Sequence, residues 1–329
     1  MHENVLDRLA ERIGRWAEVL WEPVGDGAGG FRMNNEVAVN LLSSTDLAWI
    51  LYAIGLEDPG GQWRPAWVRF LRSRQEPATG RFEYEPHAGT RLSSGHAFWH
   101  TVRALNILGG DLLHFPHYLR DVAAPAGLEA FFDAVDWSGP KSNHHEVLGL
   151  VPLLVNLARD DWTETFYRKL AEQQDPRTGT WPRGGAVDIS RTFAYSTLHL
   201  ATGRMPDRPD AILDAILSLQ RDDGLWPGGA GFLTMDSAYL LVRLPAVIGH
   251  RQGDAVEALL RLRDAMARLV ETGLDQVLCS THRTLGVVQT FSLLQEAFGE
   301  AYPSERRWRF DWDRPAFYRS KRIADGLRR

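Results

Sequence analysis

Histidine and arginine side chains stand at the beginnings of several apolar stretches of this 329-residue chain, where helices would start. Six of them fit this description: His96, His144, His145, Arg191, His282 and Arg283. Imidazole and guanidinium groups are not favoured N-caps, and a cation opposes the dipole at the start of a helix. Acid/base chemistry and the binding of an anionic group are two reasons to have them there. The pattern therefore predicts a polar functional site.

Carboxylates accompany these cations, and helix capping is an alternative explanation for each of them. Together with the histidines they supply proton donors and acceptors. We predict as catalytic residues Asp46, His144, His145, Glu146, Asp188, Asp236 and His282. We predict as substrate-binding residues Trp49, His96, Trp99, His100, Arg191, Tyr195, Tyr239 and Arg283. Glu83 and Glu85, in the loop before residue 93, would cover the same site or form part of a solvated loop.

The elements that must position these residues alternate between two kinds of helix. Six stretches have few charges and are apolar nearly all round, as buried helices are. They span residues 44–55, 93–110, 143–158, 188–203, 235–249 and 281–299. Six others have apolar residues three and four apart with charges between them, as surface helices do. They span residues 3–20, 65–75, 125–137, 162–174, 209–220 and 254–270.

Glycine ends five of the apolar stretches, where a left-handed helix cap is expected. These glycines are Gly55, Gly109, Gly203, Gly249 and Gly299, with a period of about 49 residues that is typical of repeat architectures. The compact arrangement of six such hairpins is an all-α double ring, an (α/α)6 toroid of residues 1–299 with six inner and six outer helices. An open solenoid is the alternative. In the toroid the inner helices start at one mouth, so the predicted site residues converge there.

A phrase of glutamine, glycine and an aromatic residue occurs three times where an amphipathic stretch gives way to an apolar one. The copies are "RSRQEPATGRF", "AEQQDPRTGTW" and "LSLQRDDGLWPGG". Glycine with Asp or Pro reverses the chain, the glutamine amide ties down backbone groups at the helix end, and the aromatic ring packs on neighbouring helices. The phrase resembles the QW motif of squalene-hopene cyclases. The chain from about residue 45 to 299 resembles the toroid of terpenoid cyclases and protein prenyltransferases.

This resemblance implies an enzyme that uses acid/base chemistry on an isoprenoid-type or other largely apolar substrate. Asp236 would be the acid, and His282 and Asp188 would shape the site around it. Arg191 and Arg283 would hold an anionic group such as diphosphate.

The sequence departs from that superfamily at two places in the segment "TMDSAY". The Asp-x-Asp-Asp motif of proton-initiated cyclases is reduced to Asp236, and Ala238 stands where the prenyltransferase zinc site has a cysteine. We therefore predict no cofactor. The alternative is a divalent metal ion bound by His96, His144 and His145, together with His282.

Two other classes of function stay open. Carbohydrate-active (α/α)6 enzymes, which include hydrolases, lyases and epimerases, use acids, tyrosine and tryptophan around a broad mouth, and a glycosidase needs two facing carboxylates. A non-catalytic toroid that binds a peptide or protein is the third hypothesis. A deep aromatic pocket would favour the apolar substrate, and an open groove with two facing carboxylates would favour the sugar.

Overall composition and charge narrow the classes of molecule that the protein is expected to bind. A net charge of −5 and a pI near 6.1 provide no bulk attraction to nucleic acid or anionic membranes. The single cysteine, Cys279, excludes an intramolecular disulfide. No signal peptide and no apolar run of about 20 residues is present, so we expect a cytoplasmic protein with a small-molecule substrate, of unknown oligomeric state. Residues 300–329 lack a helical period, and we expect this C-terminal extension to pack on the outside of the ring, to be mobile or to meet a partner chain.

Overall fold

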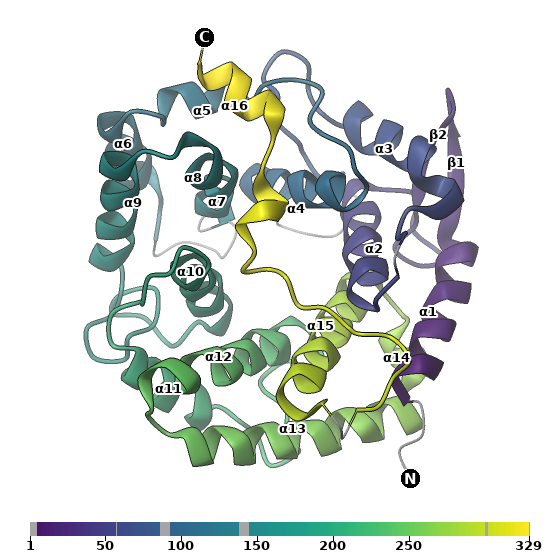
Figure 1. The fold of residues 1–329 in the computed structure, drawn as a ribbon, viewed down its shortest axis with the longest axis vertical. Helices are drawn as coiled ribbons and strands as arrows, with labels where there is room; N and C mark the ends of the chain where they lie inside the picture. Colours follow the sequence, from purple (N-terminus) through teal and green to yellow (C-terminus); the bar gives the residue numbers. More distant parts are fainter. Residues whose placement is uncertain (1–4, 57, 86–92, 138–144, 300–301, 329) are drawn as a thin grey trace. The chain divides into compact units, whose positions relative to one another are not determined.

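The structure, a computed structural model, describes residues 5–56, 58–85, 93–137, 145–299 and 302–328. Across these residues the regular structure is helical, apart from one antiparallel hairpin of β1 (Trp21–Gly25) and β2 (Ala28–Phe31) (Figure 1). The hairpin turns at Asp26 and Gly27, which both have positive φ. The all-α class is confirmed, and the hairpin is an element that the sequence analysis did not predict.

The chain divides into two compact units. The first unit comprises Met1–Leu20, Trp49–Asp58 and Gln174–Asp313. The second unit comprises Trp21–Ala48, Pro59–Gln173 and Arg314–Arg329. Each unit therefore combines helices of both predicted kinds with part of the C-terminal extension.

All six predicted amphipathic helices are present. They are α1 (Val5–Leu20), α3 (Arg64–Ser73), α6 (Pro125–Ala134), α9 (Asp160–Glu172), α11 (Pro209–Ser218) and α13 (Gln252–Thr272). In α1 the buried side chains of Leu6, Leu9 and Ile13 follow the spacing of three and four, with charged residues between them. These helices bury one face each.

The six apolar stretches also form helices. They are α2 (Leu41–Ala53), α4 (Ser94–Ile107), α7 (His145–Leu148) with α8 (Val151–Leu157), α10 (Ile189–Ala201), α12 (Phe232–Ile248) and α15 (Thr281–Phe298). Their burial extends around the helix: every residue from 95 to 105 of α4 is buried, as is every residue from 284 to 294 of α15. They are the inner helices of the fold. The remaining short helices are η1 (Gly61–Trp63), α5 (Tyr118–Asp121), α14 (Leu274–Val277), η4 (Pro315–Tyr318) and α16 (Lys321–Leu327).

The third inner helix is broken between α7 and α8, which the sequence analysis did not predict. Pro152 has no N–H to donate to the carbonyl of Leu148, and its ring would clash with that carbonyl, so the helix restarts at Val151. The break brings two glycines together: a Cβ on Gly149 would lie 2.9 Å from the Cα of Gly95 on α4. Only glycine allows α4 and α7 to approach this closely, and this approach places the first turn of α7 against that of α4.

In the first unit, α12 packs between α10 and α15, while α11 and α13 cover α12 from the other side (Figure 1). Helices α12 and α15 run parallel. Their first turns meet where the rings of Phe232 and His282 lie 4.3 Å apart, and their last turns meet in an ion pair between Arg243 and Glu296. Residues near the starts of α12 and α15 therefore share one end of this unit.

In the second unit, α4 packs on α7, α8 and α3, and α6 packs on α9. The hairpin of β1 and β2 covers α3. In this unit inner α4 thus packs on inner α7 and α8 and on outer α3, and the outer helices α6 and α9 pack on each other.

The three glutamine phrases make the same contacts, as their chemistry predicts. In each, the side-chain amide donates one bond to the carbonyl of the turn glycine and a second to a backbone carbonyl farther along the chain. The second acceptors lie 2.5–2.8 Å away, and the pairs are Gln75 with His114, Gln174 with Asp207, and Gln220 with Ala258. The aromatic rings that follow, Phe82, Trp181 and Trp226, are fully buried. Each glutamine thus ties one repeat to the next outer segment.

Four of the five predicted glycine caps are left-handed: Gly55, Gly109, Gly203 and Gly249 have φ between 69° and 80°. The prediction is wrong for Gly299, which has φ of 10°. The chain leaves α15 in another way, because Gln295 of that helix binds the C-terminal extension. Its amide accepts the N–H of Trp308 at 2.8 Å and donates to the carbonyl of Tyr302 at 3.3 Å.

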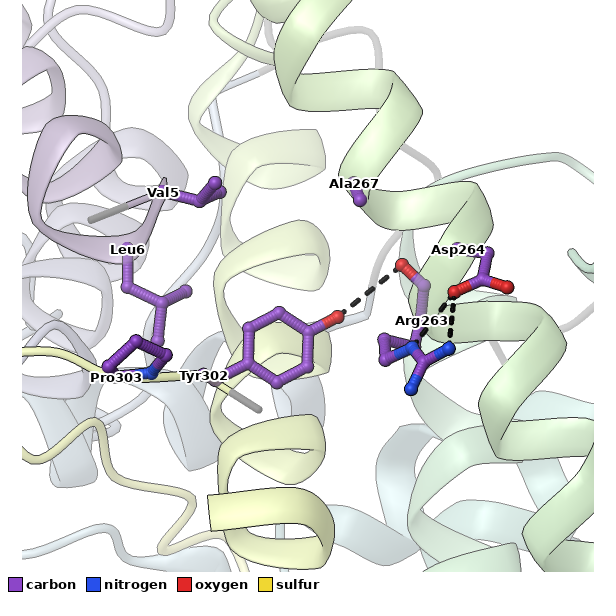
Figure 2. Close-up of a pocket in the computed structure, with 7 residues that line it drawn as sticks. All are labelled: Val5, Leu6, Arg263, Asp264, Ala267, Tyr302 and Pro303. Atoms are coloured by element: carbon purple, nitrogen blue, oxygen red, sulfur yellow. Dashed lines mark hydrogen bonds and ion pairs between the residues drawn. The ribbon is translucent and has the colours of Figure 1, made fainter. Parts of the chain in front are cut away.

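The beginning of the C-terminal extension contacts outer helices. Tyr302 and Pro303 lie against Val5 and Leu6 of α1, and the Tyr302 hydroxyl donates to the carbonyl of Arg263 of α13 at 3.4 Å (Figure 2). The hollow at this contact has a volume of about 30 Å³, room for a single water molecule, and it is no substrate site.

Beyond this point the extension lies on inner helices, so the expectation that it packs on the outside is corrected. In the first unit, Trp308 packs on α15, Phe310 on α12 and Trp312 on α2. In the second unit, Tyr318 stacks 6.3 Å from Trp99 of α4. The physical reason is a period of two: aromatic residues at 308, 310 and 312 alternate with charged ones, as in an extended segment with one buried face.

None of the helices in the described residues combines the length and the apolar character that a membrane crossing needs.

Candidate functional site

Two predicted acids lie deeper than the helix starts at which the sequence analysis placed them. Helix α2 begins at Leu41, because Asn40 accepts the N–H of Ser43 and Glu85 accepts the N–H of Leu41, both at 2.9 Å. Asp46 is therefore in the second turn of α2 and is fully buried. Asp236 is likewise one turn inside α12 and 1% exposed. Capping does not explain either residue, since a cap stands outside the first turn.

The other predicted helix starts are confirmed. Ser93 caps α4 by accepting the N–H of His96 at 3.3 Å, and Asp188 caps α10 by accepting the N–H of Arg191 at 3.1 Å. Helix α7 begins at His145, and α15 begins at Thr281. His144 lies outside the described residues.

The second unit gathers three imidazole rings. His96 and His100, one turn apart on α4, stack with ring centroids 4.0 Å apart, and the ring of His145 lies 4.7 Å from that of His96. His100 Nδ1 is 3.9 Å from Asp46 Oδ1, and the Tyr84 hydroxyl is 2.8 Å from His96 Nδ1. We call Asp46, Tyr84, His96, His100 and His145 the histidine cluster.

This cluster contains the groups needed to store and pass a proton. A buried carboxylate favours the protonated form of an imidazole near it. Burial, with smaller contributions from the charges of Asp46 and Glu85, raises the pKa of Tyr84 well above its usual range. The phenol therefore keeps its proton at neutral pH, and its hydroxyl lies at hydrogen-bond distance from His96 Nδ1. Trp99 lies beside both stacked rings, 5.9 Å from His96 and 5.1 Å from His100.

Glu146 lies at the junction of α4 and α7. Its Oε1 accepts the N–H of Gly95 at 3.3 Å and the hydroxyl of Ser94 at 3.4 Å, so it stabilises the positive end of α4. Glu83 lies near enough for its pKa to be raised, first by burial and then by the charge of Glu146, while Arg81 opposes the shift. The two acids share one electrostatic environment at this helix start.

Glu85 has a structural role. One carboxylate oxygen of Glu85 caps α2, and the other forms an ion pair with Arg74 at 2.5 Å. Of the two loop acids, only Glu83 remains on the exposed side of this loop.

In the first unit, aromatic residues flank Asp236 along α12. Phe232 lies one turn before Asp236 on the same face of α12, and Tyr239 follows nearly one turn later. The rings of Phe193, from α10, and Tyr239 pack edge to face with centroids 5.2 Å apart, and Trp312 lies 5.7 Å from Phe193 and 6.1 Å from Phe232. We call this group the aromatic cluster; its members are Trp49, Phe193, Phe232, Tyr239, Phe310 and Trp312.

His282 joins this cluster through Phe232, at 4.3 Å between ring centroids. Its neighbour Arg283 donates from Nε to the carbonyl of Ala230 at 3.1 Å and stays partly exposed. Asp188 and Arg191 form an ion pair at 3.4 Å at the start of α10. These residues therefore supply charge at the helix starts of the unit that holds Asp236.

Two predicted substrate-binding residues have other neighbours. Tyr195 is fully buried with its ring 5.6 Å from Trp181, the aromatic residue of the second glutamine phrase. Tyr239 turns its hydroxyl toward the C-terminal extension and donates to Asp313 at 3.3 Å. Burial raises the pKa of both phenols. Tyr239 still lines the aromatic cluster through its ring, while Tyr195 lies in the core.

Sequence reasoning missed Tyr84, Phe232 and Trp312. Phe232 was detectable, because it stands four residues before Asp236 and so shares its helix face. Trp312 was detectable from the alternation at 308, 310 and 312. Tyr84 stands in a loop with no periodicity, and nothing in the sequence linked it to His96.

In the described part of the chain, no three His, Cys, Asp or Glu side chains form a group that could hold a metal ion. The stacked arrangement of His96 and His100 is consistent with this, since in-plane lone pairs of two nearly parallel rings do not converge on one point between them.

Comparisons with known proteins extend the fold assignment. The sequence matches no protein-family model and no curated protein. The type II terpene cyclase MstE from Scytonema has a similar structure, with a TM-score of 0.54 and 14% identity over 89% of this chain and 98% of that one. A protein from Actinoplanes is similar too, with a TM-score of 0.52 and 16% identity over 88% and 99% of the two chains.

Rex8A from Paenibacillus barcinonensis, solved with xylose, has a much lower TM-score of 0.37, at 13% identity over 93% of this chain and 95% of that one. The likeness to the first two structures establishes the fold and nothing finer. The chain has the all-α toroid fold that its repeats predict.

Proposed function

We propose that this chain is an enzyme that performs acid/base chemistry on an isoprenoid-type or other largely apolar substrate, with Asp236 as the general acid. The observation that carries the proposal is the setting of this carboxyl group. It is 1% exposed and lies within the second turn of an inner helix. Phe232 and Tyr239, about one turn away on that helix, pack against aromatic rings of neighbouring segments. A carboxyl group in such surroundings is well suited to donate a proton to a poor base such as an alkene.

The aromatic cluster suits the product of that proton transfer. Protonation of a carbon–carbon double bond leaves a positive charge on carbon, and the proton's former electron pair stays on the Asp236 carboxylate. The faces of tryptophan, tyrosine and phenylalanine rings stabilise a cation within about 6 Å. Phe232, one turn before Asp236, offers such a face, and the buried rings of Phe193 and Trp312 belong to the same cluster. Buried rings exclude water that would quench the cation.

Charged residues at the helix starts complete the proposal. His282 adjoins Phe232 and would return a proton to Asp236 after each turnover. Arg283 and the Asp188–Arg191 pair would hold an anionic group of the substrate. The shared fold with the terpene cyclase MstE supports this assignment. The aromatic surroundings of Asp236 favour an apolar substrate over a sugar, which would need an open polar groove.

The test is a substrate panel with a matched variant. Purified protein is incubated with a prenyl diphosphate, with squalene and with xylo-oligosaccharides, and the products are analysed by mass spectrometry. We expect new cyclic alkene products from a polyprenyl substrate, formed when the final cation loses a proton, and a loss of about 10³-fold in rate for Asp236→Asn.

Asp222→Asn, at an exposed turn position, is the control and keeps the full rate. Full turnover by Asp236→Asn, or activity on the oligosaccharides alone, would overturn the proposal.

A further inference from the structure

An arginine-rich hollow lies in the first unit, apart from the aromatic cluster. Its volume is about 420 Å³, and it is lined by Gly55, Leu56, Glu305, Arg306, Arg307 and Arg309. It sits where α2 ends and where the extension leaves Gln295 near the end of α15. Asp236, by contrast, lies in the second turn of α12. The hollow is therefore a second location, whose chemistry does not depend on the proposed reaction.

The backbone that carries these arginines is held in place. The N–H of Arg309 donates to the carbonyl of Ala53 at 2.8 Å, and the carbonyl of Arg306 accepts from the side chain of Gln295 at 3.4 Å. Gly55 has φ of 80°, and a Cβ on it would lie 2.7 Å from the carbonyl oxygen of Arg307. Trp308 is buried between the arginines and anchors the segment. The three guanidinium groups are thus presented from a fixed segment.

Within the part of the chain that the structure describes, no ion pair neutralises the positive charges in the hollow. None of Arg306, Arg307 and Arg309 has a carboxylate oxygen of a described residue within 4.0 Å, although ion pairs of this length are common elsewhere on the chain. Arg309 instead lies over the ring of Tyr52, at 5.1 Å from the centroid. The negative end of α2 would attract one cation. Three arginines and one glutamate line the hollow, so its positive charge is greater than the helix end explains, although the net charge of the chain is −5.

We propose that this hollow binds the phosphate or diphosphate group of a small molecule. Guanidinium groups bind phosphate oxygens through paired, charge-assisted hydrogen bonds, and several arginines together provide the charge that a diphosphate needs. Glu305 lines the same hollow and is exposed, so its carboxylate disfavours a ligand that fills the whole space with negative charge. The phosphate group enters among the arginines, and the remainder of the ligand extends toward solvent.

The experiment is a calorimetric titration of the full chain with inorganic diphosphate. We expect binding that weakens by about 100-fold or more in the triple variant Arg306→Gln, Arg307→Gln, Arg309→Gln, because each lost charge-assisted bond costs about tenfold. The matched control changes three exposed arginines of α1, Arg8→Gln, Arg12→Gln and Arg15→Gln, and so removes the same net charge. The control binds diphosphate like the unaltered protein.

Additional arms keep the test decisive. If the triple variant does not fold, the single variant Arg307→Gln, at an exposed position, is used, with a loss of about tenfold expected.

Phosphatidylcholine vesicles with and without phosphatidic acid distinguish the source of the phosphate. Arginine-dependent binding of diphosphate in solution assigns the site to a soluble ligand, and arginine-dependent binding only to the anionic vesicles assigns it to a lipid headgroup. Equal binding by the triple variant and the control, or no binding by the unaltered protein to any probe, would overturn the proposal.

Discussion

The two units each bury an aspartate one turn inside an inner helix, and the surroundings of the two aspartates differ. Asp46 of α2 lies 3.9 Å from a nitrogen of His100, in a cluster of imidazoles closed by the Tyr84 hydroxyl. Asp236 of α12 lies next to Phe232 and Tyr239 of its own helix. Similar positions on two inner helices of the repeat therefore have different side-chain surroundings.

The physical difference lies in what each setting does to charge. Imidazoles near Asp46 can take up a proton and share the negative charge of the carboxylate, so this region favours ion-pair chemistry. Aromatic rings near Asp236 offer no counter-charge to the carboxylate but stabilise a cation. The comparison teaches that the repeat supplies the position of the acid, while the side chains from neighbouring helices decide what the acid can do.

The largest expected contrast is in activity. Asp236→Asn should lower the rate on a polyprenyl substrate by about 10³-fold, while Asp46→Asn should lower it by about tenfold. Rates measured for both variants check this. Equal losses for the two variants would remove the distinction between the two regions.

A second contrast uses the C-terminal extension, which contributes Trp312 to the aromatic cluster and Tyr318 to the face of Trp99. Trp312→Leu and Tyr318→Leu should each lower the free energy of unfolding by about 2–4 kcal/mol, since each removes a buried ring. Only Trp312→Leu should change the ratio of products, because Trp312 belongs to the aromatic cluster and packs 6.1 Å from Phe232. Chemical denaturation and product analysis on the same samples measure both effects. A changed product ratio in Tyr318→Leu alone would place the substrate in the other region.

The glutamine phrases provide the case in which the two units should behave alike. Gln75 in the second unit and Gln174 in the first make the same pair of amide bonds to backbone carbonyls. Gln75→Ala and Gln174→Ala should therefore each cost about 1–3 kcal/mol, the penalty for leaving buried carbonyls without a donor. Urea denaturation measures this, with exposed Gln252→Ala as the control. A loss confined to one of the two variants would show that the repeats are not equivalent.

The smallest expected effect concerns Glu83. Folding raises its pKa above 4.5, so the folded state favours the protonated carboxyl, and ionisation costs stability as pH rises through the folded pKa. Glu83→Gln removes that cost, so the variant should gain stability relative to the unaltered protein between about pH 4 and pH 7, with no difference in more acidic solution. Glu146→Gln should reduce this gain, because it removes one cause of the shift. Denaturation curves across this pH range show whether the gain is present.

The sequence by itself determined the helices. Periodicity separated inner from outer helices, because a helix surrounded by protein is apolar all round and a surface helix is apolar on one face. It also located the glutamine phrases and most helix starts, since turn and cap chemistry depends on residues close together in the chain. It was wrong at α2, where the N–H of Leu41 is bound by Glu85, 44 residues away, and no local pattern shows such a partner.

Only the tertiary structure decided which chemistry surrounds each acid. The stacking of His96 on His100 follows from their spacing on one helix, but the hydrogen bond with Tyr84 and the approach of His145 depend on the glycine contact between α4 and α7. Trp312 reaches Phe193 and Phe232 because the extension crosses inner helices in an extended conformation. These contacts join residues more than 40 positions apart in most cases, and their free energy depends on packing geometry that a linear pattern does not contain. The convergence of all the predicted site residues at one common mouth stays a prediction of the repeat.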